Sequence, residues 1–180
     1  MEIELRAKID NVNDIHKLLL QQGAIEHGVS KVKDYYFGYI PLYRKLGHSF
    51  WIRVRKKGDS VYLAYKGSTG KDGVYEEYET ECDNLKNALS ICRSMGLEEV
   101  ISVEKVRRSY SLGEVNAEID DFGKTGKFLE LEVIGEEINK DVLFRLFMEL
   151  GVSKDSVFEK GYITLFLQEK NSPYTKWIKN

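Results

Sequence analysis

Charged and apolar residues alternate without interruption over the first nine positions of the chain. Glu2 and Glu4 fall on even positions, whereas Ile3 and Leu5 fall on odd ones. Side chains along a β-strand point alternately to its two faces. The pattern therefore predicts a strand over residues 1–9 with one charged face and one apolar face.

The same two-residue period returns later in the chain and predicts seven further strands. Their expected ranges are 34–37, 49–57, 60–67, 74–82, 101–111, 114–121 and 127–134. Short connections between consecutive strands favour antiparallel pairing. Eight strands are enough to close a barrel. We therefore expect an α+β protein with a closed or nearly closed, mainly antiparallel eight-stranded β-barrel flanked by helices.

Apolar residues spaced three and four apart predict the helices. The expected ranges are 12–22, 84–95, 140–150 and 153–169, the last broken or kinked near Gly161. Asn11 or Asn13 is expected to cap the first helix and Asp83 the second. We expect a loop through Pro41 and Gly47, a glycine-rich loop over 67–73, and a frayed tail from about Asn171.

Composition limits the function classes. The 180 residues are 42% apolar and 31% charged, with a net charge of −2. A general nucleic-acid or membrane binder usually carries a basic excess, which this chain lacks. The two cysteines and three histidines form no zinc pattern, and Cys92 is expected to be a buried thiol. No apolar run reaches the ~20 residues of a membrane span. We expect one cytoplasmic domain over 1–180.

Charged residues dominate one face of the predicted strands, segregated by sign from strand to strand. The cationic positions are Arg6, Lys8, Arg53, Arg55, Lys66, Lys105 and Arg107, and the acidic ones are Glu2, Glu4, Glu77, Glu79, Glu81, Glu118, Asp120, Glu130 and Glu132. On a single strand such a face normally points to solvent. Its recurrence over seven strands, with few neutral polar residues, favours a lumen lined by charge.

A lumen of this kind must be wet, or its charges must be paired, because burying an uncompensated charge is expensive. A water-filled tunnel that receives a polyanion satisfies this condition. Arginine and lysine bind phosphate oxygens, and carboxylates bind hard cations such as Mg²⁺ or Mn²⁺.

Several segments resemble the CYTH superfamily, the triphosphate tunnel metalloenzymes. Glu2-x-Glu4-x-Arg6 resembles its ExExK signature. Further blocks follow in the family order: Asp34-Tyr35-Tyr36-Phe37, Trp51-Ile52-Arg53-Val54-Arg55, Leu63-Ala64-Tyr65-Lys66-Gly67, Glu76-Glu77-Tyr78-Glu79, Lys105-Val106-Arg107-Arg108-Ser109-Tyr110, Phe128-Leu129-Glu130-Leu131-Glu132 and Lys160-Gly161-Tyr162. The resemblance covers residues 1 to about 167.

Three positions depart from the family pattern. Arg6 stands where the signature has lysine, which keeps the charge but excludes proton transfer at that position. Tyr75 stands where a basic residue often precedes the EExE strand. Lys124-Thr125-Gly126 stands where the family has GLG, which bears on the local turn and on substrate fit.

The resemblance implies roles for the charged residues. Those expected to bind the triphosphate are Arg6, Lys8, Arg53, Arg55, Lys66, Lys105, Arg107 and Lys160. Those expected to bind metal are Glu2, Glu4, Glu130 and Glu132, followed by Glu79 and Asp120. Glu77, Glu81 and Glu118 are expected to pair with cations. Lys66 is the candidate catalytic base or leaving-group stabiliser, because nearby Arg53 and Arg55 would lower the pKa of its ammonium group.

The resemblance also implies an enzyme that acts on a triphosphate with Mg²⁺ or Mn²⁺. The size of the chain and the N-terminal position of the signature are most similar to class IV adenylyl cyclases, which convert ATP to cyclic AMP and pyrophosphate. Thiamine triphosphatase and inorganic tripolyphosphatase activities remain alternatives, because they use the same phosphate-binding residues.

Two other function classes stay open at this point. A non-catalytic polyphosphate- or nucleotide-binding module gains nothing from lumen carboxylates, and single-stranded nucleic-acid binding needs a basic groove with exposed aromatic residues. The sequence leaves the substrate undecided, and either a monomer or a homodimer is compatible with it.

Overall fold

A computed structural model describes residues 1–71, 73–135 and 140–177. The chain forms two compact units. The first unit comprises Met1–Lys31 and Lys105–Lys160, and the second comprises Val32–Glu104 and Gly161–Asn180. The two longest strands, β2 (Ile25–Gly38) and β6 (Glu98–Leu112), contribute residues to both units.

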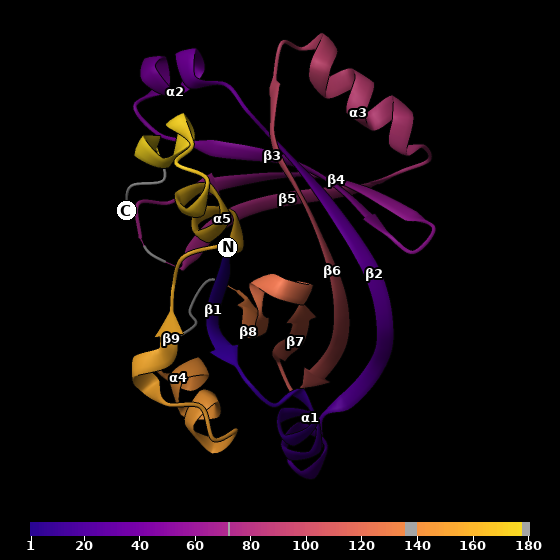
Figure 1. Cartoon of the computed structure of the whole chain (residues 1–180), viewed down its shortest axis with the longest axis vertical. Helices are drawn as coiled ribbons and strands as arrows, with labels where there is room; N and C mark the ends of the chain where they lie inside the picture. Colours follow the sequence, from indigo (N-terminus) through magenta and orange to yellow (C-terminus); the bar gives the residue numbers. More distant parts are fainter. Residues whose placement is uncertain (72, 136–139, 178–180) are drawn as a thin grey trace. The chain divides into compact units, whose positions relative to one another are not determined.

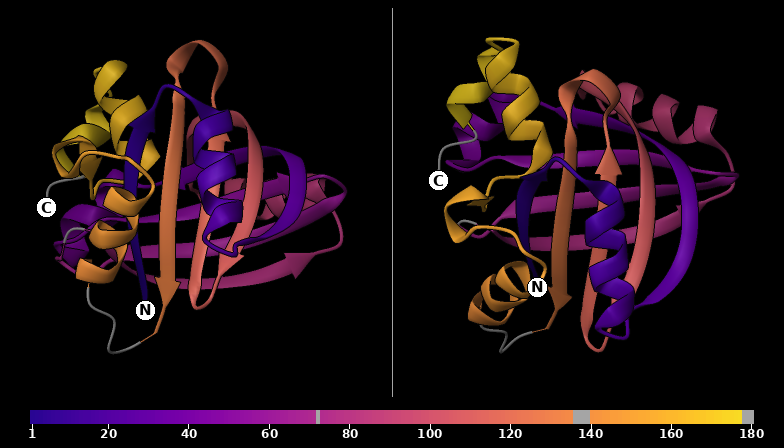
Figure 2. Two further views of the ribbon diagram at one scale, coloured as in Figure 1. Left: turned by 90° about the horizontal axis from the view of Figure 1, so that it is seen from below. Right: turned by 60° about the horizontal axis from the view of Figure 1, so that its bottom comes forward.

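The first unit is built on antiparallel strands in the order β6-β7-β8-β1-β9 (Figure 1). Its further elements are β1 (Glu2–Ile9), α1 (Val12–Gln21), β7 (Val115–Asp121), η1 (Gly123–Thr125), β8 (Lys127–Ile134), α4 (Lys140–Glu149), η2 (Lys154–Ser156) and β9 (Val157–Phe158). Figure 2 shows α1 lying against the strands of this unit. His16 of α1 has its Nδ1 2.7 Å from the hydroxyl of Tyr110 on β6.

The second unit contains antiparallel strands in the order β5-β4-β3-β2. Its further elements are α2 (Ile40–Leu46), β3 (Phe50–Lys57), β4 (Ser60–Ser68), β5 (Val74–Cys82), α3 (Leu85–Ser94), α5 (Tyr162–Glu169) and η3 (Pro173–Trp177). The predicted α+β class and its eight mainly antiparallel strands are confirmed, and the two-residue β9 is an addition.

The apolar face of β1 is buried, as its alternating pattern predicts. Leu5 and Ala7 are completely buried, as are Leu129 and Leu131 on the neighbouring strand β8. Leu143 of α4 is also fully buried. Burying a leucine side chain contributes about 2 kcal/mol, so the apolar face of this sheet supplies much of the stability of the first unit.

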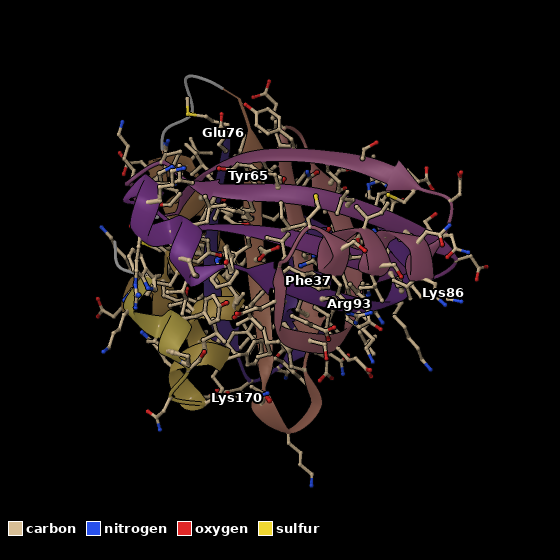
Figure 3. All side chains as sticks on the ribbon, turned by 90° about the horizontal axis from the view of Figure 1, so that it is seen from above. Phe37, Tyr65, Glu76, Lys86, Arg93 and Lys170 are labelled. Atoms are coloured by element: carbon tan, nitrogen blue, oxygen red, sulfur yellow. The ribbon has the colours of Figure 1, made fainter. Side chains whose placement is uncertain are left out.

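The core of the second unit lies between its sheet and α3. Phe37 and Val54 are fully buried there against Ala88 and Cys92 of the helix. Figure 3 labels Phe37 beside α3. The prediction that Cys92 is a buried thiol is confirmed, and burial raises the pKa of that thiol.

Two predictions around Pro41 need correction. The strand expected over 34–37 is the last part of the fourteen-residue β2, whose polar first half hides its length in the sequence. Residues 40–46 form α2 instead of a loop, because proline is tolerated in the first turn of a helix. Gly47 ends α2 with a left-handed φ of 77°.

The C-terminal predictions need correction as well. The helix expected over 153–169 forms only as α5, and η2 and β9 precede it because Val157 and Phe158 pair with β1. The tail is ordered through η3, where buried Tyr174 donates a hydrogen bond to Glu98 at 2.5 Å. Residues 178–180 of the predicted frayed tail lie outside the described residues.

The caps of α1 and α3 can now be assigned. Asn11 caps α1 by accepting hydrogen bonds from the amides of Asn13 and Asp14. Asn84, rather than the predicted Asp83, caps α3 by accepting from the amide of Asn87. Within the described ranges, every helix is too short or too polar to cross a membrane.

Candidate functional site

Strand pairing gathers charged residues on one face of the first unit. The register of β1 and β8 places Glu4 opposite Glu132 and Arg6 opposite Glu130. Directly opposed residues of antiparallel strands share a face. The charged side of β1 therefore adjoins the acidic side of β8, and the apolar core lies behind both strands.

Arg6 is held by protein oxygen atoms on several sides. Its Nη2 lies 2.6 Å from Glu4 Oε1 and its Nε lies 2.6 Å from Glu130 Oε2. Its Nη1 donates a 3.5 Å hydrogen bond to the carbonyl oxygen of Lys160. With 4% of its side chain exposed, Arg6 fixes the positions of two carboxylates.

Asp120 organises the cations of β6. Its fully buried carboxylate accepts two hydrogen bonds from Arg107, from Nε at 2.7 Å and from Nη2 at 2.6 Å. Lys105 Nζ donates a third at 2.8 Å. Burial alone would raise the pKa of Asp120, but the Arg107 and Lys105 charges outweigh it and hold this pKa below its usual value.

Glu130 links the two arginines. Arg107 Nη2 donates to it at 2.9 Å, and Arg6 contacts its other oxygen. Glu118, the register neighbour of Glu130 on β7, is bound less tightly to the arginine, since its Oε2 lies 3.8 Å from Arg107 Nε. Burial raises the pKa of Glu118. Glu130 thus connects β1, β6 and β8.

Three carboxylates of the first unit are arranged as metal ligands. One oxygen atom from each of Glu2, Glu4 and Glu132 lies within 4.8 Å of the other two. Glu4 is buried, whereas Glu2 and Glu132 are half-buried, so the group is open on one side. Mg²⁺ and Mn²⁺ prefer oxygen ligands and commonly keep water or phosphate oxygens in their remaining positions. These residues fit such an ion.

The structure does not bring all predicted metal ligands together. Among the described contacts, Glu130 and Asp120 lie against arginine and lysine instead of within this triad. Glu79 belongs to the second unit. Lys8 and Lys160 are exposed, and it is the main chain of Lys160 that contacts Arg6.

The second unit carries its own charged cluster. Arg53 Nη2 contacts Glu77 at 2.6 Å and Glu79 at 2.8 Å. Lys66 Nζ lies 3.2 Å from the other oxygen of Glu77. Ala64 stands in register between Arg53 and Glu79, and its small side chain allows the contact across β4. The predicted pairing role of Glu77 is therefore observed.

Sequence reasoning missed the partner of Arg55. Asp34 accepts from Arg55 Nε at 2.7 Å and from Arg55 Nη2 at 3.0 Å. Asp34 is 3% exposed. Strand register pairs the two residues, so extending the two-residue alternation along β2 would have indicated this contact.

Two tyrosines also lie among these cations. Lys66 Nζ lies 4.5 Å from the centre of the Tyr75 ring, a cation–π geometry that favours the charged ammonium group. Tyr36 stands opposite Arg53 in register. Burial is the main cause that raises the pKa of Tyr36 to about 12, so its hydroxyl stays neutral near pH 7.

Both clusters consist of cations held in place by carboxylates. A buried cation is tolerated because an acidic partner compensates it. Cations fixed in this way can stabilise negative charge on a ligand without rearranging. The arrangement suits recognition of phosphate groups, and the carboxylate triad adds a place for a metal ion.

We predict that Asp120→Asn destabilises the protein strongly. Removing one member of a buried ion pair leaves its partners uncompensated, at a cost of about 3–5 kcal/mol. Here Lys105 and Arg107 would lose their shared anion. Urea unfolding at pH 7 without ligand measures the free energy of unfolding.

Asp121→Asn is the matched control. Asp121 is the next residue on β7, and its ion pair with Lys127 is long, at 3.8 Å, and partly exposed. An exposed pair contributes about 0–1 kcal/mol. Equal losses in the two variants would contradict the central role given to Asp120.

Comparisons with known proteins agree with this geometry. The family model described as the CYTH domain matches residues 1–162. A protein of Methanocaldococcus jannaschii, named as a putative adenylate cyclase, is 30% identical over 173 residues, covering 92% of this chain and 98% of that protein.

Solved structures share the fold. The PH1012 protein from Pyrococcus horikoshii has a TM-score of 0.80 and 29% identity, covering 92% of this chain and 99% of its own. An adenylyl cyclase-like protein from Hippeastrum, described as having a dominant triphosphatase activity, has a TM-score of 0.63 and 15% identity, covering 96% of this chain and 97% of its own. With the family model matching most of the chain, this protein belongs to the CYTH family of triphosphate tunnel enzymes, whose members use divalent metal ions.

Proposed function

We propose that this protein is a divalent-metal-dependent adenylyl cyclase that converts ATP to cyclic AMP and pyrophosphate. One observation carries the proposal: the metal-capable triad of Glu2, Glu4 and Glu132 adjoins, through Arg6, a set of cations held by buried carboxylates. A simple anion-binding module would not need the triad. The similarity to the Methanocaldococcus jannaschii protein supports the choice of reaction.

The cations of each unit are proposed to bind phosphate groups. Arg107 and Lys105 in the first unit, and Arg53, Arg55 and Lys66 in the second, present N–H groups held by acidic partners. Arg6 positions carboxylates as well as adding charge. Lys8 and Lys160 are proposed to contact phosphate oxygens from exposed positions.

Glu2, Glu4 and Glu132 are proposed to hold Mg²⁺ or Mn²⁺, with Glu130, Asp120 and Glu79 in supporting roles. A bound divalent ion supplies positive charge that orients phosphate oxygens. Arg6 compensates the charge of Glu4 at 2.6 Å, which helps three carboxylates to lie close together.

In the proposed reaction the ribose 3′-hydroxyl attacks the α-phosphorus. The new O–P bond closes the cyclic ester, the bond to the β-phosphate oxygen breaks, and pyrophosphate leaves with the electron pair. Fixed cations stabilise the charge that develops on the phosphate oxygens. Lys66 is proposed either to accept the hydroxyl proton as a neutral amine, or to stabilise the leaving group as an ammonium ion, in which case the hydroxyl proton passes to water.

Hydrolysis is the second candidate. The same cations and carboxylates suit attack by water on a terminal phosphorus, which makes the protein a thiamine triphosphatase or an inorganic tripolyphosphatase. The activity described for the Hippeastrum protein is the reason to measure hydrolysis beside cyclisation. Cytoplasmic location, a single functional domain and a monomer or homodimer stay predictions.

Product analysis tests the reaction. The protein is incubated with ATP, thiamine triphosphate or tripolyphosphate, with Mg²⁺ or Mn²⁺ present. We expect cyclic AMP and pyrophosphate from ATP. Release of orthophosphate alone would show that the protein is a triphosphatase and would contradict the cyclase assignment. Metal-dependent binding without any turnover would leave only a binding module.

We predict that Glu132→Gln weakens the binding of the activating metal ion. A neutral amide is a poorer ligand for a hard cation than a carboxylate. The Mg²⁺ concentration for half-maximal activity should rise about tenfold or more, in line with the loss of one metal ligand. Glu114→Gln, at an exposed turn position of the first unit, is the control. An unchanged Mg²⁺ requirement in Glu132→Gln would contradict the assignment of the triad.

Two variants of Lys66, one neutral and one charge-preserving, test its role. Lys66→Met should lower kcat roughly a hundredfold, typical for the loss of an electrostatic or proton-transferring group. Because Glu77 and the Tyr75 ring favour the charged ammonium group, we expect Lys66→Arg to retain more activity than Lys66→Met. Arginine does not release its proton, so equal losses of kcat in Lys66→Arg and Lys66→Met would indicate that Lys66 acts as a base. Full activity in Lys66→Met would make it a spectator.

A further inference from the structure

Three phenylalanine side chains interrupt the charged face of the first unit. Phe128 on β8 stands in register with Lys8 on β1 and with Asp120 on β7. Phe158 on β9 stands in register with Arg6. Opposed residues share a face, so these rings lie on the side of Asp120 and Arg6. The apolar core of the unit is on the other side of the sheet.

The rings of Phe122, Phe128 and Phe158, here called the aromatic cluster, contact one another edge to face. The centre of the Phe128 ring is 5.7 Å from that of Phe122, with an interplanar angle of 78°, and 6.1 Å from that of Phe158, at 88°. Phe128 is 6% exposed, whereas Phe122 and Phe158 are half-buried. Phe128 thus supports two rings that keep accessible surface.

A cation of the proposed phosphate site adjoins the aromatic cluster. Lys105 Nζ lies 5.4 Å from the centre of the Phe122 ring and 2.8 Å from Asp120 Oδ2. One ammonium group therefore contacts both the charged network and an aromatic ring. A ligand whose phosphates lie against Lys105 would carry its next chemical group toward the cluster.

The loop after β7 fixes Phe122 and Lys8 at this place. The amide of Phe122 donates a 3.0 Å hydrogen bond to the carbonyl oxygen of Gly126. Gly126 has a φ of 128°, and a Cβ atom there would lie 3.1 Å from Lys8 Cε. The positive φ therefore favours glycine here, and a Cβ atom would in addition displace the end of the Lys8 side chain slightly. The altered turn Lys124-Thr125-Gly126 retains this glycine.

We propose that the aromatic cluster binds the planar ring of an organic triphosphate, a nucleobase or a comparable heteroaromatic ring. This inference rests on the proposed function and adds to it a preference for organic over inorganic triphosphates. Phosphate contacts alone cannot provide such a preference, because every triphosphate offers them.

Matched Phe→Leu variants test the proposal. Phe122→Leu, Phe158→Leu and the double variant are compared with Phe144→Leu, a half-buried residue of α4 whose ring lies near Lys154 instead. For each protein, KM, or Kd where there is no turnover, is measured with Mg²⁺ for ATP and for tripolyphosphate. Thermal unfolding verifies that each variant is folded.

We expect Phe122→Leu and Phe158→Leu each to weaken the binding of ATP roughly tenfold, the usual effect of removing one stacking ring. The binding of tripolyphosphate should change by no more than about twofold. Phe144→Leu should change neither. If the binding of both ligands weakened equally, the cluster would serve only packing. If the binding of ATP were unchanged, the cluster would not be part of the ligand site. A wild-type protein that uses tripolyphosphate but no organic triphosphate would refute this inference alone, whereas one that binds no triphosphate would refute the proposed function.

Discussion

The pairing of buried cations with buried carboxylates is the constraint on which the rest of this structure depends. Arg107 and Lys105 share Asp120, and Arg107 and Arg6 share Glu130. Each of these side chains is at least nine-tenths buried. An uncompensated charge at such a depth would cost several kcal/mol, so the strand register that creates these pairs must be accurate. A shift of one residue would turn the charged set into the apolar core.

The balance of the two signs supports the proposed placement of a metal ion in the first unit. Its charged face carries six acidic residues, namely Glu2, Glu4, Glu118, Asp120, Glu130 and Glu132, against four cations, namely Arg6, Lys8, Lys105 and Arg107. A triphosphate is itself strongly anionic, and would meet a face with two surplus negative charges. A divalent cation at the proposed triad would cancel that surplus. The proposed site would therefore favour a triphosphate and its metal together over the triphosphate alone.

The alternation of charged and apolar residues along the strands could be predicted from the sequence, because a two-residue period is visible locally. The even positions of β1 and β8 predict the shared charged face correctly, and the pairing of Arg53 with Glu77 follows from the same pattern. Features set by distant partners were not predictable. Residues 157 and 158 form a strand only because they pair with the edge of β1. Asp83 and Asn84 are both suitable capping residues, and only the structure shows that Asn84 caps α3. The contacts of Arg6 likewise depend on the paired strand β8.

The pairing of β1 with β8 has a consequence for biosynthesis. Glu4 and Arg6 are synthesised well before their partners Glu132 and Glu130, which lie far later in the chain. Until then the first strand has no neighbour to complete its ion pairs, and such long-range strand pairing is slow to form. The signature residues are therefore made long before the strand that completes their site.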